Sequence, residues 1–370
     1  MMKLCRIDEF FQEEISGYLP YIIPQKEMIQ MKNWPKQIES GIWQGGHCQG
    51  IAVDEKNGWM LYSFTTMLVK TDLNGRFIGS VRGLLGHLGC IAFCKENGRL
   101  YGSLEYKTDA IGRGILARVG SDAELANGFY IAVFDVSRID RPDMDASADG
   151  VMTTVFLPDV LNDYEGQGIN GAAHRYGCSG IDGVTFGPMP GSSEPKQYLF
   201  VAYGVYGDTQ REDNDHQVLL CYDTQDWQRY EQPLVQTAMH RSGPACPLHR
   251  FFVPTGNTTY GVQNLEYDPA SGLFLMAVYP GKKQQYPNYR LFAVDASKAA
   301  EQRELSGLAG ERGEVLSLCG DGWHFAWGST GLCALGDGLF YISHDEKTQQ
   351  GFASCARLYR WNGIDPFELV

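Results

Sequence analysis

The stretch that decides the fold is residues 47–63, HCQGIAVDEKNGWMLYS, because the chain repeats its pattern. A short apolar run at 50–53, a turn at Asn57 and Gly58, and a second apolar run at 59–63 predict two antiparallel strands joined by a tight hairpin. The pattern returns at residues 90–103, 183–202, 264–277 and 331–343. Five copies of one strand pair predict a radial all-β array, since a single copy cannot bury its own faces.

Each copy is followed by a third predicted strand that ends at a turn-forming Asp or Asn. These strands are 67–72, 130–135, 218–223, 290–295 and 357–362. The shared register makes five second-strand positions equivalent: Ser63, Ser103, Ala202, Ala277 and Ser343. On this pattern the chain resembles the β-propeller superfold with five blades, although it lacks the Gly-His and Trp-Asp marks of WD40 repeats. The resemblance is one of architecture and implies no activity.

The expected fold class is therefore all-β, a five-bladed β-propeller with a short N-terminal helical or extended segment. We place the propeller at residues 41–370 and an N-terminal extension, packed on it, at residues 1–40. Asp8 is expected to cap a short helix in that extension. Residues 28–31 and 367–370 compete as the strand that closes the ring.

Composition narrows the classes of partner. The chain has 44 acidic and 31 basic side chains and a net charge of -13, which argues against nucleic acid or an anionic membrane as a partner. It contains no run of eighteen uncharged apolar residues that would predict a membrane span. The ten cysteines form no CxxC pair and the first residues do not resemble an export signal, so we expect a cytoplasmic protein with reduced thiols. Oligomeric state is not indicated.

The long connections are predicted to gather at one end of the propeller. The innermost strand of each blade runs along the central channel, so the loop before the first strand and the loop after the second open on the same face, which we call the entry face. The connections at 105–128, 157–180, 204–216, 233–260 and 279–288 all belong to it. All eight histidines are assigned to this face as well. Long loops on a rigid scaffold commonly carry function.

His47 and His87 are the leading catalytic candidates, because they precede the first two inner strands by the same offset. They are expected to meet at the channel mouth, with Asp182 and Glu105 as further catalytic groups. His47, His87, Asp182 and Gln263 also form a candidate ligand set for a divalent metal, which would be zinc, manganese or calcium. The same residues can act as acid and base without a metal. Alternatively, each imidazole only bonds to a nearby loop carbonyl.

Other polar and aromatic residues are candidates for binding the substrate. They are Gln49, Gln263, Asn264, Tyr106, Tyr203, His344 and Arg175. Aromatic rings suit the apolar faces of a sugar, and an arginine can clamp a carboxylate or phosphate. Equally, the aromatics can simply hold long loops on the propeller. Glu266 stands where other blades have small residues, so it either enters the channel or pairs with a neighbouring blade.

These residues support two functional hypotheses. The first is a hydrolase or lyase that acts on a small polar, carbohydrate-derived molecule at the channel mouth. The alternative is a non-catalytic propeller that binds a small-molecule, saccharide or protein partner on the same loops. No G-x-S-x-G elbow, P-loop or dinucleotide fingerprint is present, so serine-nucleophile and nucleotide chemistry find no support.

Overall fold

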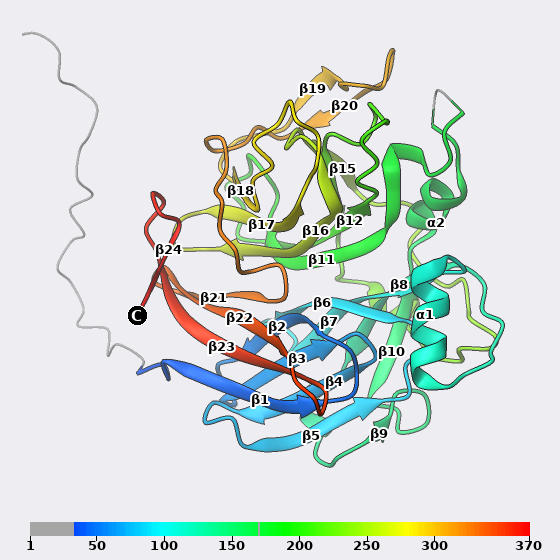
Figure 1. The fold of residues 1–370 in the computed structure, drawn as a ribbon, viewed down its shortest axis with the longest axis vertical. Helices are drawn as coiled ribbons and strands as arrows, with labels where there is room; N and C mark the ends of the chain where they lie inside the picture. The colour runs from blue at the N-terminus through cyan, green and yellow to red at the C-terminus, as the bar shows by residue number, and fades with distance from the viewer. Residues whose placement is uncertain (1–32, 169–170) are drawn as a thin grey trace, which may run out of the picture. The chain divides into compact units, whose positions relative to one another are not determined.

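The computed structural model describes residues 33–168 and 171–370, and residues 35–370 form one compact unit. Five sheets, each built mainly from antiparallel strands, make a five-bladed β-propeller, which confirms the predicted fold (Figure 1).

Blade one contains β2 (Cys48–Asp54), β3 (Trp59–Phe64), β4 (Met67–Asp72) and β5 (Phe77–Arg82). Blade two contains β6 (His87–Cys94), β7 (Arg99–Tyr106), β8 (Gly128–Phe134) and β10 (Met152–Phe156). Blade three contains β11 (Cys178–Pro188), β12 (Gln197–Val205), β13 (Gln217–Tyr222) and β15 (His249–Val253). Blade four contains β16 (Thr258–Asp268), β17 (Leu273–Pro280) and β18 (Leu291–Asp295). Blade five contains β21 (Leu332–Gly336), β22 (Leu339–Lys347), β23 (Phe352–Trp361), β24 (Phe367–Leu369) and β1 (Gln37–Trp43).

The predicted register holds on the second strands. Ser63, Ser103, Ala202, Ala277 and Ser343 lie in β3, β7, β12, β17 and β22, respectively. All five are fully buried. Small side chains at this position let adjacent blades approach closely. For example, the Ser63 hydroxyl donates to the Gly89 carbonyl of the next blade at 2.6 Å.

The fourth strands and their extensions were not individually predicted. Loops within later blades supply short outer strands to earlier ones. β9 (Met144–Asp145), between β8 and β10, pairs with β5, and β14 (Gln232–Pro233), between β13 and β15, pairs with β10. On blade three, β20 (Arg312–Val315) pairs with β15, and β19 (Glu301–Glu304) pairs with β20. These strands come from later parts of the chain than the blades that they extend. The connections therefore tie neighbouring blades together.

The ring is closed by β1, which pairs antiparallel with β23 of blade five. The Tyr62 hydroxyl of blade one donates to the Ile38 carbonyl of β1 at 3.0 Å, so this strand also contacts the first blade. The predicted competitor at 367–370 pairs with the other end of β23 as β24. The other competitor, residues 28–31, and the helix expected after Asp8 lie outside the described residues. The compact unit begins at Pro35, because β1 belongs to the propeller.

Bulges in the inner strands control which side chains face the channel. The pairing register shifts near the start of β2, β6, β11 and β16. A bulge adds one residue, so side chains three positions apart can face the same side of a strand. Two sets of equivalent positions result. The entry ring is Gln49, Gly89, Asp182, Gln263 and Thr330, and the exit ring is Ala52, Ala92, Thr185, Glu266 and Cys333.

Two helices lie on the entry side of the propeller (Figure 1). The first, α1 (Ala110–Val119), is capped by Asp109, whose carboxylate accepts the backbone N–H groups of Ile111 and Gly112. The second, α2 (Pro158–Glu165), begins with a proline in its first turn. The largest apolar cluster joins blades two and three. Within the described ranges, no helix combines the length and apolar character needed to span a membrane.

Candidate functional site

A buried polar cluster lies at the entry end of the channel and contains three of the predicted catalytic residues. His87 begins β6, Glu105 lies at the end of β7, and Asp182 belongs to the entry ring on β11. The Nδ1 atom of His87 lies 3.6 Å from Glu105 and 3.6 Å from Asp182. Burial, more than the nearby cations, lowers the pKa of His87 to about 3, so the imidazole is neutral at pH 7.

Lys107 completes this cluster and was missed by the sequence analysis. Its ammonium lies 2.5 Å from Glu105 and donates to the Ser179 carbonyl at 2.9 Å. Burial lowers the pKa of Lys107, but Glu105 and two further carboxylates outweigh this effect and raise it, so Lys107 stays charged. Lys107 directly follows the last residue of β7 and lies two positions after Glu105, and this spacing was the available signal.

The predicted metal set gains no support from the geometry. No group of three or more His, Cys, Asp and Glu side chains in the described part of the chain has metal-holding geometry. Gln263 donates its amide to Asp182 at 3.2 Å instead of turning an oxygen toward a shared cation. The ammonium of Lys107 already provides a cation beside the carboxylates of the cluster.

The remaining channel-mouth residues bond to one another. His47 lies 3.1 Å from the amide of Gln49, which also donates to Thr65. Asn264 donates to the Gln49 carbonyl at 2.9 Å and to the Ser329 carbonyl at 3.0 Å, and so joins segments from three blades. The hollow beside His87 has a volume of about 10 Å³, which holds one water at most. The cluster is therefore closed to a substrate in this conformation.

Four predicted binding residues have polar or ring partners outside this cluster, although Tyr106 also borders the hollow beside His87. The Tyr106 hydroxyl donates to Gln236, and the Tyr203 hydroxyl donates to Asp163. His344 stacks on Trp327 with ring centroids 3.8 Å apart. Arg175 pairs with Glu311 at 3.1 Å. Alternation along a strand explains Tyr106, because neighbours on a strand face opposite sides, and Tyr106 follows Glu105 directly.

The assignment of all eight histidines to the entry face is wrong for His249. We placed this residue in a connection that leads to the next inner strand, but it begins β15, the fourth strand of blade three. His249 pairs with Cys221, near the exit end of β13. A fourth strand starts at the exit face because it runs antiparallel to the third. Its imidazole bonds to Glu314 at 3.0 Å.

An open cavity of about 650 Å³ lies on the entry face, between loops of blades three and four. It falls within the size range of small-molecule sites. Its polar and aromatic wall residues are His174, Tyr206, Asp208, Arg211, Thr259, Tyr260 and Lys282. Gln263 connects the cavity to the buried cluster, because its amide donates both to the Tyr260 carbonyl and to Asp182. The cavity and the channel mouth are thus neighbouring parts of one site.

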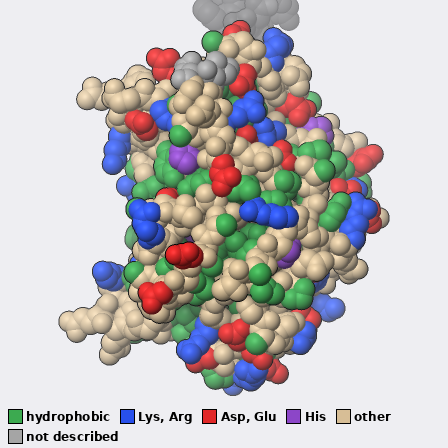
Figure 2. Space-filling model, turned by 90° about the vertical axis from the view of Figure 1, so that its right-hand side faces the viewer, with side chains coloured by type: hydrophobic (Ala, Val, Ile, Leu, Met, Phe, Trp, Pro, Cys, Tyr) green, Lys and Arg blue, Asp and Glu red, His purple; other side chains and the backbone are tan. Residues whose placement is uncertain are grey.

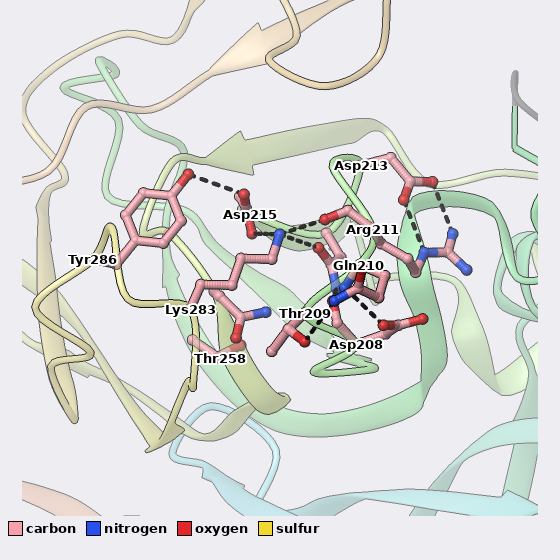
Figure 3. Close-up of polar contacts among 12 residues, drawn as sticks. Asp208, Thr209, Gln210, Arg211, Asp213, Asp215, Thr258, Lys283 and Tyr286 are labelled. Carbon is pink, nitrogen blue, oxygen red and sulfur yellow. Dashed lines mark hydrogen bonds and ion pairs between the residues drawn. The ribbon is translucent and has the colours of Figure 1, made fainter.

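A buried lysine holds the loops beside this cavity in place (Figure 3). The ammonium of Lys283 lies 2.5 Å from Asp215 and donates to Asn214 and to the Arg211 carbonyl. The Tyr286 hydroxyl donates to the other oxygen of Asp215 at 2.9 Å. These contacts join the loop at 206–216 to the loop at 281–290. The two loops that carry Tyr206, Asp208, Arg211 and Lys282 of the cavity wall are therefore held together, which favours a preformed binding site.

His174 has the geometry of a base on the cavity wall. Its Nδ1 atom lies 2.6 Å from the Tyr164 carbonyl, which can only accept, so Nδ1 carries a proton and Nε2 is the ring nitrogen left for a substrate. The ring lies between Tyr164 and Tyr206, with centroid distances of 4.7 and 5.0 Å. His174 has φ 64°, and Tyr260 on the same wall has φ 63°. Such backbone strain is often found at functional sites.

Of the two basic side chains on the cavity wall, one has an ion-pair partner and the other has none among the described residues. Arg211 is neutralised by two bonds to Asp213, at 2.8 Å each, and donates its remaining groups to loop carbonyls. The exposed ammonium of Lys282 makes no ion pair or hydrogen bond with any described residue. On the entry face as a whole, acidic and basic side chains are interspersed, together with histidines (Figure 2). The face thus shows no single-sign field that would favour a polymer of one charge.

Comparisons with known proteins assign no family. No family model and no curated protein matches the chain. Similar solved structures include the PQQ domain of pyranose dehydrogenase from Coprinopsis cinerea, with a TM-score of 0.38 and 10% identity over 83% of this chain and 81% of that chain. The soluble aldose sugar dehydrogenase of Escherichia coli gives a TM-score of 0.36 and 9% identity over 86% and 99%. A putative glucose dehydrogenase from Thermus gives 0.33 and 14% over 85% and 96%. Likeness at this level assigns no chemistry to this chain.

Proposed function

We propose that the protein is a lyase that acts on a small, carbohydrate-derived acid in the entry-face cavity. The observation that carries this proposal is the placement of His174: its Nδ1 is committed to the Tyr164 carbonyl at 2.6 Å, while its ring lines a cavity of about 650 Å³. An imidazole held in one tautomer by a carbonyl is a suitable general base at neutral pH.

The reaction that fits these groups is β-elimination next to a carboxylate. The Nε2 atom of His174 takes the proton from the carbon that bears the carboxylate, and the electron pair forms a carbon–carbon double bond. The bond from the next carbon to its oxygen breaks, and the imidazolium returns the proton to that leaving oxygen. The unpaired ammonium of Lys282 would stabilise the substrate carboxylate as its charge increases. Tyr206 and Tyr260 suit the apolar faces of a sugar ring.

Elimination agrees with the cavity better than glycoside hydrolysis does. Most glycosidases need two carboxyl groups on opposite sides of the scissile bond. Among the described residues that line the cavity, Asp208 is the single carboxylate, and one of its oxygens accepts the Gln210 N–H. Glu105 and Asp182 cannot supply the second carboxylate, since the channel mouth is closed.

The closed channel mouth also supports one alternative function, which is binding without catalysis. A cavity between two loops that are held together, next to an acid/base cluster that substrate does not reach, also suits a propeller that binds a saccharide acid without converting it. The two functions differ only in turnover. The same experiment therefore has to measure both binding and product.

The test compares the wild type with His174→Asn and Lys282→Gln on a panel of uronate oligosaccharides. Asparagine tolerates the left-handed backbone of residue 174 and can still donate to the Tyr164 carbonyl, but it has no basic nitrogen. We expect wild-type protein to form an unsaturated product that is detected by ultraviolet absorbance. In His174→Asn, turnover should fall by roughly 100-fold or more with affinity nearly unchanged. In Lys282→Gln, affinity should fall by roughly 2- to 5-fold.

The other outcomes are equally clear. Calorimetric binding without any product in the wild type would overturn the lyase and support the binding propeller. Neither binding nor product would overturn both functions. Oxidation of a sugar with an added electron acceptor would place the protein in another enzyme class.

A further inference from the structure

A second cavity lies at the exit end of the channel, on the opposite side of the propeller from the proposed lyase site. Its volume is about 400 Å³, and all five inner strands contribute to its wall. The five exit-ring side chains all line it: Ala52, Ala92, Thr185, Glu266 and Cys333. Four of these are small, which leaves room for a ligand of modest size.

Glu266 is the one carboxyl group of the exit ring. Its Oε1 accepts the Ala334 N–H at 2.7 Å, and its Oε2 lies 3.4 Å from the Thr185 hydroxyl. The side chain therefore does both things that the sequence allowed: it borders the channel and bonds to neighbouring blades. Fixed from two blades, the carboxyl group keeps its place on the cavity wall whether or not a ligand is present.

The rest of the wall favours an apolar body with a positive charge. Phe93, Phe186 and Tyr267 supply aromatic surface, and aliphatic side chains of β2 and β6 supply most of the remainder. The charged wall residues are Glu55, Lys95, Glu96 and Glu266, three acids and one base. Lys95 is paired with Glu55 at 2.8 Å. An anionic ligand would find no unpaired cation on this wall, because Lys95 is bound to Glu55, whereas aromatic rings and a carboxylate together suit an ammonium group.

We propose that the exit cavity binds a small organic amine, with its ammonium group on Glu266 and its apolar part among Phe93, Phe186 and Tyr267. The ligand would carry one ammonium and a hydrocarbon or aryl body. Binding at this site does not depend on the lyase proposal, because the two cavities share no wall residue.

Proton release is a specific signature of this contact. Burial, the main cause, raises the pKa of Glu266 to about 8; the Ala334 N–H and Lys95 oppose it, and Asp268 adds to it. Cys333, the other titratable group of the exit ring, keeps its proton because burial raises its pKa. The empty site therefore holds a neutral acid at pH 7. An incoming R–NH3⁺ stabilises the carboxylate, and the acid gives its proton to the solvent.

The experiment is calorimetry with phenethylamine and, as a matched neutral probe, phenethyl alcohol. Titrations in buffers with different ionisation enthalpies at pH 7 report the number of protons released. We expect the amine to bind at least 10-fold more tightly than the alcohol and to release close to one proton. Glu266→Gln should remove both the preference and the proton release. Glu96→Gln makes the same side-chain change at an exposed position of the wall and should retain both.

Three results would overturn the inference. The first is equal affinity for amine and alcohol, the second is unchanged amine binding in Glu266→Gln, and the third is no binding by either probe, which would leave a solvent-filled channel. His174→Asn should bind amine normally, and Glu266→Gln should keep any lyase turnover. Failure of one proposal is thus distinguishable from failure of the other.

Discussion

The Glu266→Gln variant should also change how stability depends on pH in the absence of any ligand. In the folded protein the pKa of Glu266 is raised from 4.5 to about 8, mainly by burial. A carboxyl group with a raised folded pKa contributes stability that is fully present below pH 4.5 and is lost as pH rises toward 8. The unfolded chain loses the proton first, so each pH step in that window favours unfolding.

The magnitude follows from the same values. A tenfold difference in proton affinity between the folded and unfolded states is worth about 1.4 kcal/mol. Linkage then gives a loss of about 3.5 kcal/mol from this group between about pH 5 and about pH 8. Glutamine imitates the neutral acid: its carbonyl can accept the Ala334 N–H and its amide can donate to Thr185. The variant should therefore keep its stability across this range.

Urea unfolding of both proteins at several pH values measures the effect directly. The stability difference, variant minus wild type, should increase with pH by about 3.5 kcal/mol between about pH 5 and about pH 8. Glu96→Gln controls for the loss of one negative charge from the same wall, and it should follow the wild-type profile. Parallel profiles for wild type and Glu266→Gln would refute the argument, because they would mean that Glu266 is ionised in the folded protein at pH 7.

Three further predictions concern the channel mouth and the ring. Lys107→Met should lower the free energy of unfolding by about 3–5 kcal/mol, because it leaves the Glu105 carboxylate buried without its cation. Chemical denaturation measures this loss, and adding Glu105→Gln should recover part of it. Additive effects of the two substitutions would contradict the pairing. The pKa of His87 in the folded protein is lowered from 6.5 to about 3, so its contribution to folding stability is present above pH 6.5 and is lost as pH falls. Between about pH 7 and about pH 5, His87→Gln should therefore lose about 2 kcal/mol less stability than the wild type in chemical denaturation. Equal acid sensitivity of the two proteins would count against a neutral, buried imidazole. Deletion of residues 37–43 removes β1 and leaves the outer edge of β23 unpaired along most of its length. We therefore expect a lower melting temperature and faster amide hydrogen exchange in β23. Unchanged exchange in β23 would show that β1 does not close the ring.

The five-bladed fold was predictable because its strongest signals are local. An Asn-Gly turn between two apolar runs fixes a hairpin, and the repeat fixes the number of blades. The closing strand was not predictable in the same way. Residues 37–43, QIESGIW, have no counterpart in the other blades, and their partner β23 lies more than 300 residues away. Pairing over such a distance leaves no mark on the local pattern.

The candidate site was predicted in part, for reasons that lie in strand geometry. His87, Glu105 and Asp182 do meet at the channel mouth, because the entry ends of β6, β7 and β11 converge there. Lys107 was overlooked although it lies just two residues after Glu105, directly beyond the end of β7. The helix α1, which covers the cluster, was also overlooked, since Gly112 and Gly114 weaken its helical pattern. A closed cluster and an open cavity cannot be told apart from residue types alone.

The different character of the two channel ends follows from the inner-strand bulges. Each bulge lets two residues of a strand face the channel, one in the entry ring and one in the exit ring. The entry ring contains Gln49, Asp182 and Gln263, whose long polar side chains bond to their neighbours, and Asn264 ties the blades together beside them. Apart from Glu266, the exit ring contains only small side chains, which leave a cavity of about 400 Å³.

Enlarging Ala52 or Ala92 to leucine should therefore block amine binding at the exit cavity without affecting the entry-face site. Calorimetry with phenethylamine reports on the exit cavity, and calorimetry with a uronate ligand reports on the entry-face site.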